Sequence, residues 1–275
     1  MRELLERLNF LPVFDTNRWP ARELLSRVCG IAAVSFFLVR KAAQYPQQAK
    51  YSTFFHPLVV RLTGGEAEVG EFGLGDLWIL VWAVESAIFL GYILSFLTRE
   101  RSKKPPVGFM EVVFPFIVAG LPVLISMLPY TFTEVFPRTF ELLGTRFSRT
   151  DLLWAVGGLM AAGGLLNLVG LLALRRAFTI MTDARALITR GPFALVRHPL
   201  YAGHFVMFLG VTLLHISPLT AAMYAAFVAS QYVRAKIEER KLESVFPEYA
   251  AYRERTGMFF PRPAFLRGKK RRNEE

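Results

Sequence analysis

The sequence predicts an all-α fold: a polytopic transmembrane helical bundle of about six spans with a cytoplasmic C-terminal helix. Hydrophobic residues make up 53% of the 275 residues, and the mean hydropathy is +0.34. These residues occur in blocks of about 20, the length at which a helix crosses a bilayer. Lys and Arg cluster beside the ends of the blocks, as they do in membrane proteins.

The apolar blocks give the expected order of the spans. The last two are joined only by His215–Pro218, so they must be antiparallel neighbours. Residues 40–76 are predicted to form a long polar loop, whose acidic residues, Asp76 included, are expected in solvent. Residues 1–20 are predicted to form a short amphipathic helix on the membrane surface. The expected spans are residues 24–39, 77–97, 107–130, 152–174, 201–214 and 219–233.

The net charge of +11 would suggest nucleic acid in a soluble chain, but here it is better explained by membrane topology. All but seven of the 33 Lys and Arg residues fall on one side if both termini are cytoplasmic. We therefore expect a multi-pass protein with both termini in the cytoplasm and no nucleic-acid partner. The single cysteine, Cys29, permits no internal disulfide, and the four scattered histidines offer no metal site.

Three regions are predicted. Residues 1–150 are N-terminal scaffold spans that carry no motif, residues 151–262 are the core that carries the chemistry, and residues 263–275 are a basic, disordered tail. Such a tail attracts the anionic headgroups of membrane lipids, although it is equally well explained as a topology signal.

Polar residues crowd into the stretch 190–203, RGPFALVRHPLYAG. Pro199 disfavours helix at His198 and suits the first turn of the next helix. His198 is therefore expected at a helix entrance, where free N–H groups favour anions, with Arg197 beside it and Tyr201 one turn inside. The alternative is an interfacial anchor with Tyr201 in an aromatic belt, and spacing alone favours that interpretation.

A second polar stretch, residues 234–252, follows the predicted hairpin of spans. Arg234 and Glu238 share one helical face at i and i+4, and Glu239 is adjacent; the alternative is a solvated helix with an ordinary ion pair. Because a two-span hairpin returns the chain to the face it left, the two stretches should meet there. We expect them to build one active site at the cytoplasmic surface.

The ordered combination of these motifs resembles the isoprenylcysteine carboxyl methyltransferase family, whose superfamily also holds phospholipid N-methyltransferases and thiol S-methyltransferases. The resemblance covers Gly191 to Arg262: a glycine turn, RHPLYAG, two spans, EERKL and spaced tyrosines. One departure is Phe246-Pro247, which stands where the family has Phe-Gly and leaves the local turn in doubt.

The resemblance implies S-adenosylmethionine as cofactor, bound without a Rossmann domain. It implies that His198 and Tyr201 line the cofactor pocket, and that Gly191 and Gly203 allow close backbone approach. Glu238 and Glu239 would hold polar groups of the cofactor, and Arg197 could pair with its carboxylate. The last two assignments are contact-level hypotheses.

The acceptor is expected to be hydrophobic or lipidated and to enter from the bilayer. A carboxylate acceptor is ionised at pH 7, so it needs a cation to hold it, and Arg234 is the candidate. An amine or thiol acceptor would instead need a base such as Glu238 or His198. O-methylation of a carboxylate is the leading interpretation, and N- or S-methylation of a phospholipid amine or small thiol is the nearest alternative.

Two other classes of protein stay open: a nicotinamide-dependent membrane reductase and a non-catalytic membrane scaffold or transporter. Two polar residues inside the spans bear on the outcome. Glu85 is expected either to pair with an arginine near the substrate region or to be a protonated structural residue. His204 is interpreted as a core histidine.

Overall fold

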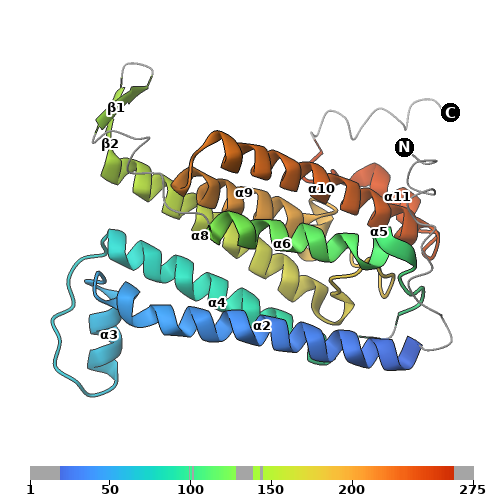
Figure 1. The fold of residues 1–275 in the computed structure, drawn as a ribbon, viewed down its shortest axis with the longest axis horizontal. Coiled ribbons are helices and arrows are strands. Elements are labelled where there is room, and N and C mark those ends of the chain that lie inside the picture. Colours follow the sequence, from blue (N-terminus) through green and yellow to red (C-terminus); the bar gives the residue numbers. More distant parts are fainter. Residues whose placement is uncertain (1–18, 99, 101, 128–138, 143–144, 263–275) are drawn as a thin grey trace, which may run out of the picture.

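Long apolar helices run side by side between two ends of the molecule in the computed structural model (Figure 1). The structure describes residues 19–98, 100, 102–127, 139–142 and 145–262. The predicted surface helix of residues 1–20, except its last two residues, and the basic tail of residues 263–275 lie outside the described residues. A two-stranded antiparallel hairpin, in which Thr139 faces Ser148, is added to the helices.

The elements follow one another with short connections. The helices are α2 (Trp19–Ala49), α3 (Phe55–Leu62), α4 (Leu74–Thr98), α5 (Gly108–Val112), α6 (Phe114–Met127), α8 (Arg149–Leu174), α9 (Pro199–Leu214), α10 (Pro218–Glu243) and α11 (Tyr249–Arg255). The strands are β1 (Thr139–Leu142) and β2 (Thr145–Ser148), and the 3-10 turns are η2 (Arg175–Ala177) and η3 (Gly191–Ala194).

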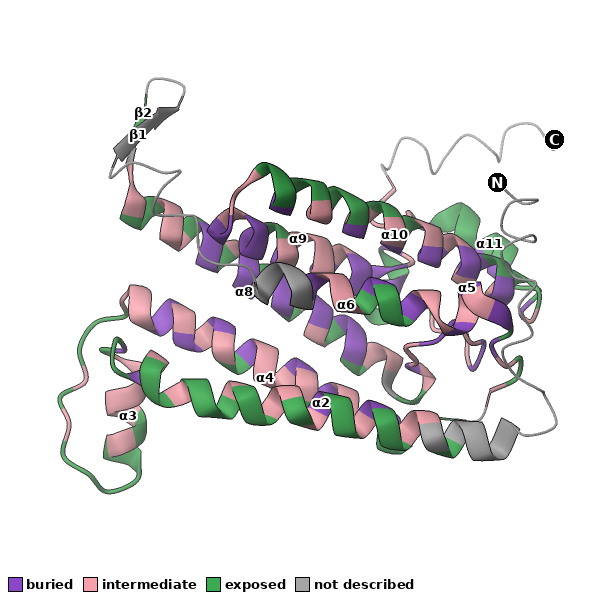
Figure 2. Cartoon of the chain, viewed as in Figure 1, coloured by how far each residue is buried: buried purple, intermediate pink, exposed green. Residues whose placement is uncertain are grey.

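The outer surface of the helices is apolar, as a lipid-facing surface must be. Three helices are long and apolar enough to cross a membrane: Ser26–Ala49, Leu74–Thr98 and Arg149–Leu174. Large apolar side chains on α2 and α4 point outward, among them Phe36, 60% exposed, and Leu94, 58% exposed (Figure 2). A soluble protein rarely exposes so many, so the prediction of a membrane-embedded helical bundle is confirmed. The count of six spans stays a prediction.

Successive helices alternate in direction, so the connections gather at two ends (Figure 1). One end holds α3, the β-hairpin and the α9–α10 turn; the other holds the start of α9, the end of α10, and α11. The predicted antiparallel pairing of α9 and α10 is confirmed. Ser217 and Thr220 form a reciprocal capping box, which starts α10 directly after the turn.

Helices α8 and α9 touch backbone to backbone because glycines line their contact. A Cβ added at Gly163 would lie 2.3 Å from the Met207 nitrogen, and one at Gly203 would lie 2.7 Å from the Asn167 nitrogen. Small residues allow membrane helices this close approach. Gly203 therefore gives α9 its closeness to α8, which is a different use from the predicted approach to a cofactor.

The prediction of one long polar loop over residues 40–76 is wrong. Helix α2 continues to Ala49, and α3 follows. Asp76, expected in solvent, is fully buried and accepts hydrogen bonds from the Ser52 hydroxyl (2.5 Å) and from the Phe54 and Phe55 amides (both 3.0 Å). One buried carboxylate thus orders the connection between α2 and α4.

The prediction that Glu85 pairs with an arginine or stays unpaired is also wrong. Glu85 on α4 forms an ion pair with Lys41 on α2, and the Trp82 indole donates to the Lys41 carbonyl oxygen at 2.7 Å. Lys41 escaped notice because the first span was expected to end at Val39. The pair joins two helices far from the polar stretches at residues 190–203 and 234–252.

Candidate active site

The backbone around Arg197 and His198 is held by the chain that follows α11. The Arg197 amide donates to the Gly257 carbonyl at 2.8 Å, and the His198 amide donates to the Met258 carbonyl at 3.0 Å. Pro199 then starts α9 at its first turn, as the sequence predicts. This short extended pairing fixes where the side chains of Arg197 and His198 point.

Gly191 opens the turn before this segment. Its φ of +60° lies in the left-handed region that favours glycine, and it begins the 3-10 turn η3. The Tyr252 hydroxyl donates to the Phe193 carbonyl at 2.6 Å, so α11 clasps this turn. The Phe246-Pro247 departure does not disturb the fold locally, because the Tyr249 amide still closes onto the Phe246 carbonyl at 3.0 Å.

Glu239 ties the two polar stretches together. Its Oε1 accepts from Arg197 Nε at 2.7 Å and lies 3.3 Å from His198 Nε2, and its residue is only 3% exposed. Arg197 also donates to the carbonyls of Arg253, at 3.2 Å, and Thr256. Glu239 and Arg197 therefore spend most of their hydrogen-bonding capacity on each other and on the protein, so we assign them positioning roles.

Glu238 leads a second, more open group. Its Oε1 accepts from the Tyr201 hydroxyl and from Arg234 Nε, the latter at 3.2 Å. The Glu238 side chain is 24% exposed, against 4% for Glu239. The Tyr201 ring stacks on His198 with 5.3 Å between ring centroids and 2° between planes. Adjacent glutamates thus face different partners, and Glu238 is the one that a ligand can reach.

Arg234 sits over the Tyr201 ring, 5.4 Å from its centroid, and is 7% exposed. Its Nη2 donates to the Ile180 carbonyl at 2.6 Å. Within the described part of the chain, Nη1 makes no hydrogen bond to protein. A nearly buried guanidinium with one free edge can bind a carboxylate.

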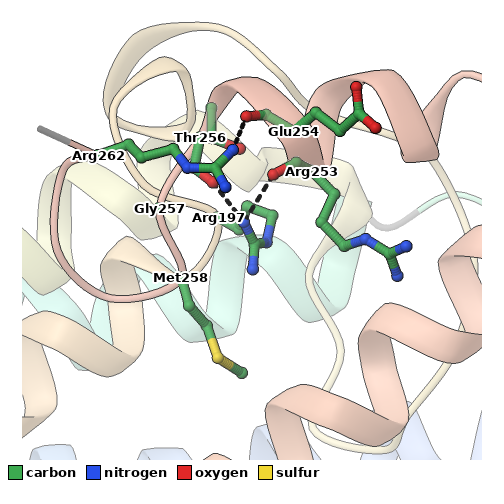
Figure 3. A pocket seen from close by; sticks show the side chains of 7 residues that line it. All are labelled: Arg197, Arg253, Glu254, Thr256, Gly257, Met258 and Arg262. Atoms are coloured by element: carbon green, nitrogen blue, oxygen red, sulfur yellow. Dashed lines mark hydrogen bonds between the residues drawn. The ribbon is translucent and has the colours of Figure 1, made fainter. Parts of the chain in front are cut away.

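A surface cleft of about 320 Å³ borders this site on the side of α11 (Figure 3). The Arg197 guanidinium points into it, and the Arg262 guanidinium donates to the Glu254 carbonyl across it. Only Arg197 belongs to both the cleft and the two glutamate groups. The lining residues are Arg197, Arg253, Glu254, Thr256, Gly257, Met258 and Arg262.

Sequence reasoning missed a buried ionic network beside the site. Lys241 donates to Glu111 at 2.5 Å and to the carbonyls of Pro105 and Thr182. Asp183 and Arg185 pair at 2.5 Å with no side-chain exposure. The only available signal was the polar run TDAR, which lies in a segment treated as a loop. This network fixes the segment whose Ile180 carbonyl receives Arg234.

The pKa of Glu239 makes this anchor sensitive to acid. Burial alone would raise it, but hydrogen bonds from His198 and Arg197 outweigh burial and lower the pKa from 4.5 to about 2. The ionised carboxylate therefore stabilises the fold fully above pH 4.5, and this contribution is lost as the pH falls through about 2. The difference corresponds to about 3 kcal/mol.

We expect Glu239→Gln to be less stable than wild type at pH 7 and to lose this part of the acid dependence. Unfolding in detergent can be followed by tryptophan fluorescence between pH 7 and pH 2. Glu243→Gln is the matched control, because Glu243 lies on the same helix in an exposed pair with Arg253. Equal acid profiles for wild type and Glu239→Gln would contradict the assigned anchor.

Comparisons with known proteins agree with this geometry. A family model for phospholipid methyltransferase matches residues 153–249, which run from α8 to the first residue of α11. The chain is 31% identical to the cobalt-zinc-cadmium resistance protein CzcN of Cupriavidus metallidurans over 175 residues, 63% of this chain and 69% of that protein.

It is also 29% identical to the nickel-cobalt-cadmium resistance protein NccN of Alcaligenes xylosoxydans xylosoxydans over 174 residues, 63% of this chain and 70% of that protein. The described residues contain no group of three or more His, Cys, Asp or Glu side chains placed to hold a metal ion. The match to the family model and the likeness to CzcN identify the family: this chain belongs to the superfamily of isoprenylcysteine carboxyl methyltransferases and phospholipid methyltransferases.

Proposed function

We propose that this protein is an integral membrane methyltransferase that uses S-adenosylmethionine to methylate a carboxylate on a lipidated or hydrophobic acceptor. The observation that carries the proposal is the Arg234–Glu238–Tyr201 group, which is polar, nearly buried, and set at the end of an apolar bundle. It combines a reachable carboxylate with a guanidinium that has a free edge.

The residues present fit a cationic methyl donor. The exposed part of Glu238 offers a carboxylate, and the rings of His198, Tyr201 and Phe259 offer aromatic faces, both of which favour a nearby positive charge. When bound, S-adenosylmethionine supplies a methyl group whose carbon–sulfur bond breaks, with its electron pair kept by sulfur, as the acceptor oxygen bonds to the carbon.

The chain's own contribution is alignment and exclusion of water. Glu239 holds Arg197 and His198 in place, and the stacked His198 and Tyr201 rings form a wall. Arg234 Nη1 holds the acceptor carboxylate, which needs no base because it is already ionised at pH 7. The acceptor's tail lies along the apolar helices, and the cofactor enters from the cytoplasm.

We expect Glu238→Gln to weaken the binding of S-adenosylhomocysteine about tenfold, because the variant loses the negative charge that Tyr201 and Arg234 orient. Isothermal titration calorimetry on detergent-purified protein measures this. Glu85→Gln is the control: it also removes one carboxylate, but from the Lys41 pair between α2 and α4. Equal losses in the two variants would mean that the site has been misplaced.

The proposed reaction is tested with a methyl-labelled donor. Membranes that contain the protein are incubated with it, and the label is followed into lipid, protein and volatile fractions. A methyl ester releases its label as methanol in mild base, whereas an N- or S-methyl group does not. Base-stable label would favour the N- or S-methylation alternative, and the absence of protein-dependent label would contradict methyl transfer.

A further inference from the structure

Several buried polar atoms in the centre of the bundle have no hydrogen-bond partner within the described residues. They are Oδ1 and Nδ2 of Asn167 on α8, Nδ1 of His204 on α9, and Oε1 of Gln231 on α10. Asn167 is fully buried and Gln231 is 2% exposed. Both lie in the region of the helices that the proposed function does not use.

Three of these groups lie close to one another and to Arg234. The Tyr92 hydroxyl on α4 is 3.4 Å from His204 Nε2, and the Asn167 amide lies beside the Tyr92 hydroxyl. Asn167 is also next to Gly203 across the α8–α9 contact. The charge of Arg234 acts on both Tyr92 and His204. Gln231 precedes Arg234 by one helical turn and shares its face of α10.

Unpaired polar atoms in such a place need an explanation. Buried polar groups are almost always hydrogen-bonded, and an apolar membrane interior makes an unpaired one more costly. Thr212, also buried on α9, follows the usual pattern: its hydroxyl donates to the Phe208 carbonyl at 2.7 Å. The unpaired atoms near Arg234 are therefore suited to a ligand that supplies their partners.

The types of atom define what that ligand must offer. Arg234 Nη1 and Asn167 Nδ2 are donors, which match carboxylate oxygens. Asn167 Oδ1 and Gln231 Oε1 are acceptors, which an ionised carboxylate cannot satisfy because it has no hydrogen to donate. A head group that satisfies both sets carries a hydroxyl or N–H next to its carboxylate.

We propose that Tyr92, Asn167, His204 and Gln231 form a polar subsite that selects acceptors with a hydrogen-bond donor beside the carboxylate. This inference rests on the proposed function and adds the residues that read the acceptor. Asn167 and Gln231 accept from the donor group, and Tyr92 orients His204 through their shared contact. The subsite draws on four helices, so α4 of the N-terminal region takes part in recognition.

The test uses matched pairs of probe acceptors that differ only in the donor. One pair is 2-hydroxypalmitate and 2-methoxypalmitate, and the other is N-palmitoylglycine and N-palmitoylsarcosine; together they separate a hydroxyl from an N–H source. Binding is measured by calorimetry with S-adenosylhomocysteine present at saturation. We expect wild type to bind the donor-bearing member of at least one pair about tenfold more tightly than its methylated partner.

Gln231→Leu and Asn167→Leu should bring that ratio close to one while the affinity for S-adenosylhomocysteine stays unchanged. Gln231→Leu keeps the test valid if the larger side chain at the tight α8–α9 contact prevents Asn167→Leu from folding. Thr212→Val is the control and should keep the wild-type ratio.

A ratio near one in wild type, no binding of any probe, or an unchanged ratio in the variants would overturn the subsite. Loss of S-adenosylhomocysteine binding by wild type would instead count against the proposed function itself.

Discussion

Replacing Arg234 with alanine should slow methyl transfer to a carboxylate on the order of 100-fold while changing the affinity for S-adenosylhomocysteine far less. Arg234 is nearly buried, and Nη1 is the edge of its guanidinium that stays open to an acceptor. A lost charge-assisted contact to the acceptor oxygen acts on the reacting end of the substrate. The cofactor analogue does not need that contact.

The measurement is a single-turnover methyl-transfer assay on detergent-purified protein, with calorimetry for the analogue. Arg234→Lys is the informative second variant, because it keeps the charge but loses the planar fork that binds Ile180 and Glu238 together. We expect it to recover only part of the rate. Unchanged turnover in Arg234→Ala would remove Arg234 from the acceptor site and would favour an amine or thiol acceptor.

Gly163→Ala should destabilise the protein strongly, by about 3 kcal/mol or more. The new Cβ would lie 2.3 Å from the Met207 nitrogen and 2.7 Å from the Gly203 carbonyl oxygen, and both are backbone atoms that cannot rotate away. Helices α8 and α9 would have to separate. That separation would also move the start of α9, where His198 and Tyr201 lie.

Thermal unfolding in detergent, followed by tryptophan fluorescence, tests this. Gly158→Ala is the matched control: it lies on the same helix, and its added Cβ meets no atom within 4 Å. It should be neutral or slightly stabilising, since alanine favours helix more than glycine does. Similar melting temperatures for the two variants would contradict the close α8–α9 contact.

The arrangement of the bundle was largely predictable because apolar blocks and their breaks are written directly in the sequence. The four-residue turn at His215–Pro218 required α9 and α10 to be antiparallel, and they are. The same argument predicted that His198 and Tyr201 would meet Glu238 and Glu239, which the hydrogen bonds between them confirm. Hairpin geometry, rather than any single motif, made this possible.

The roles within the site could not be predicted from spacing. Glu238 and Glu239 are adjacent in sequence, but successive helical residues point about 100° apart, so one is open and the other closed. The Lys41–Glu85 pair and the buried Asp76 depend on where α2 ends, and helix ends are hard to place. Lys241 and Glu111 are 130 residues apart, and nothing local links them.

The central claim is that the two polar stretches form a binding site for the methyl donor. Calorimetry on the wild-type protein in detergent, titrated separately with S-adenosylhomocysteine and with NADPH, tests it most directly. The account predicts saturable one-to-one binding of S-adenosylhomocysteine and no binding of NADPH. Binding of NADPH without binding of S-adenosylhomocysteine would contradict the account and would point to a membrane reductase.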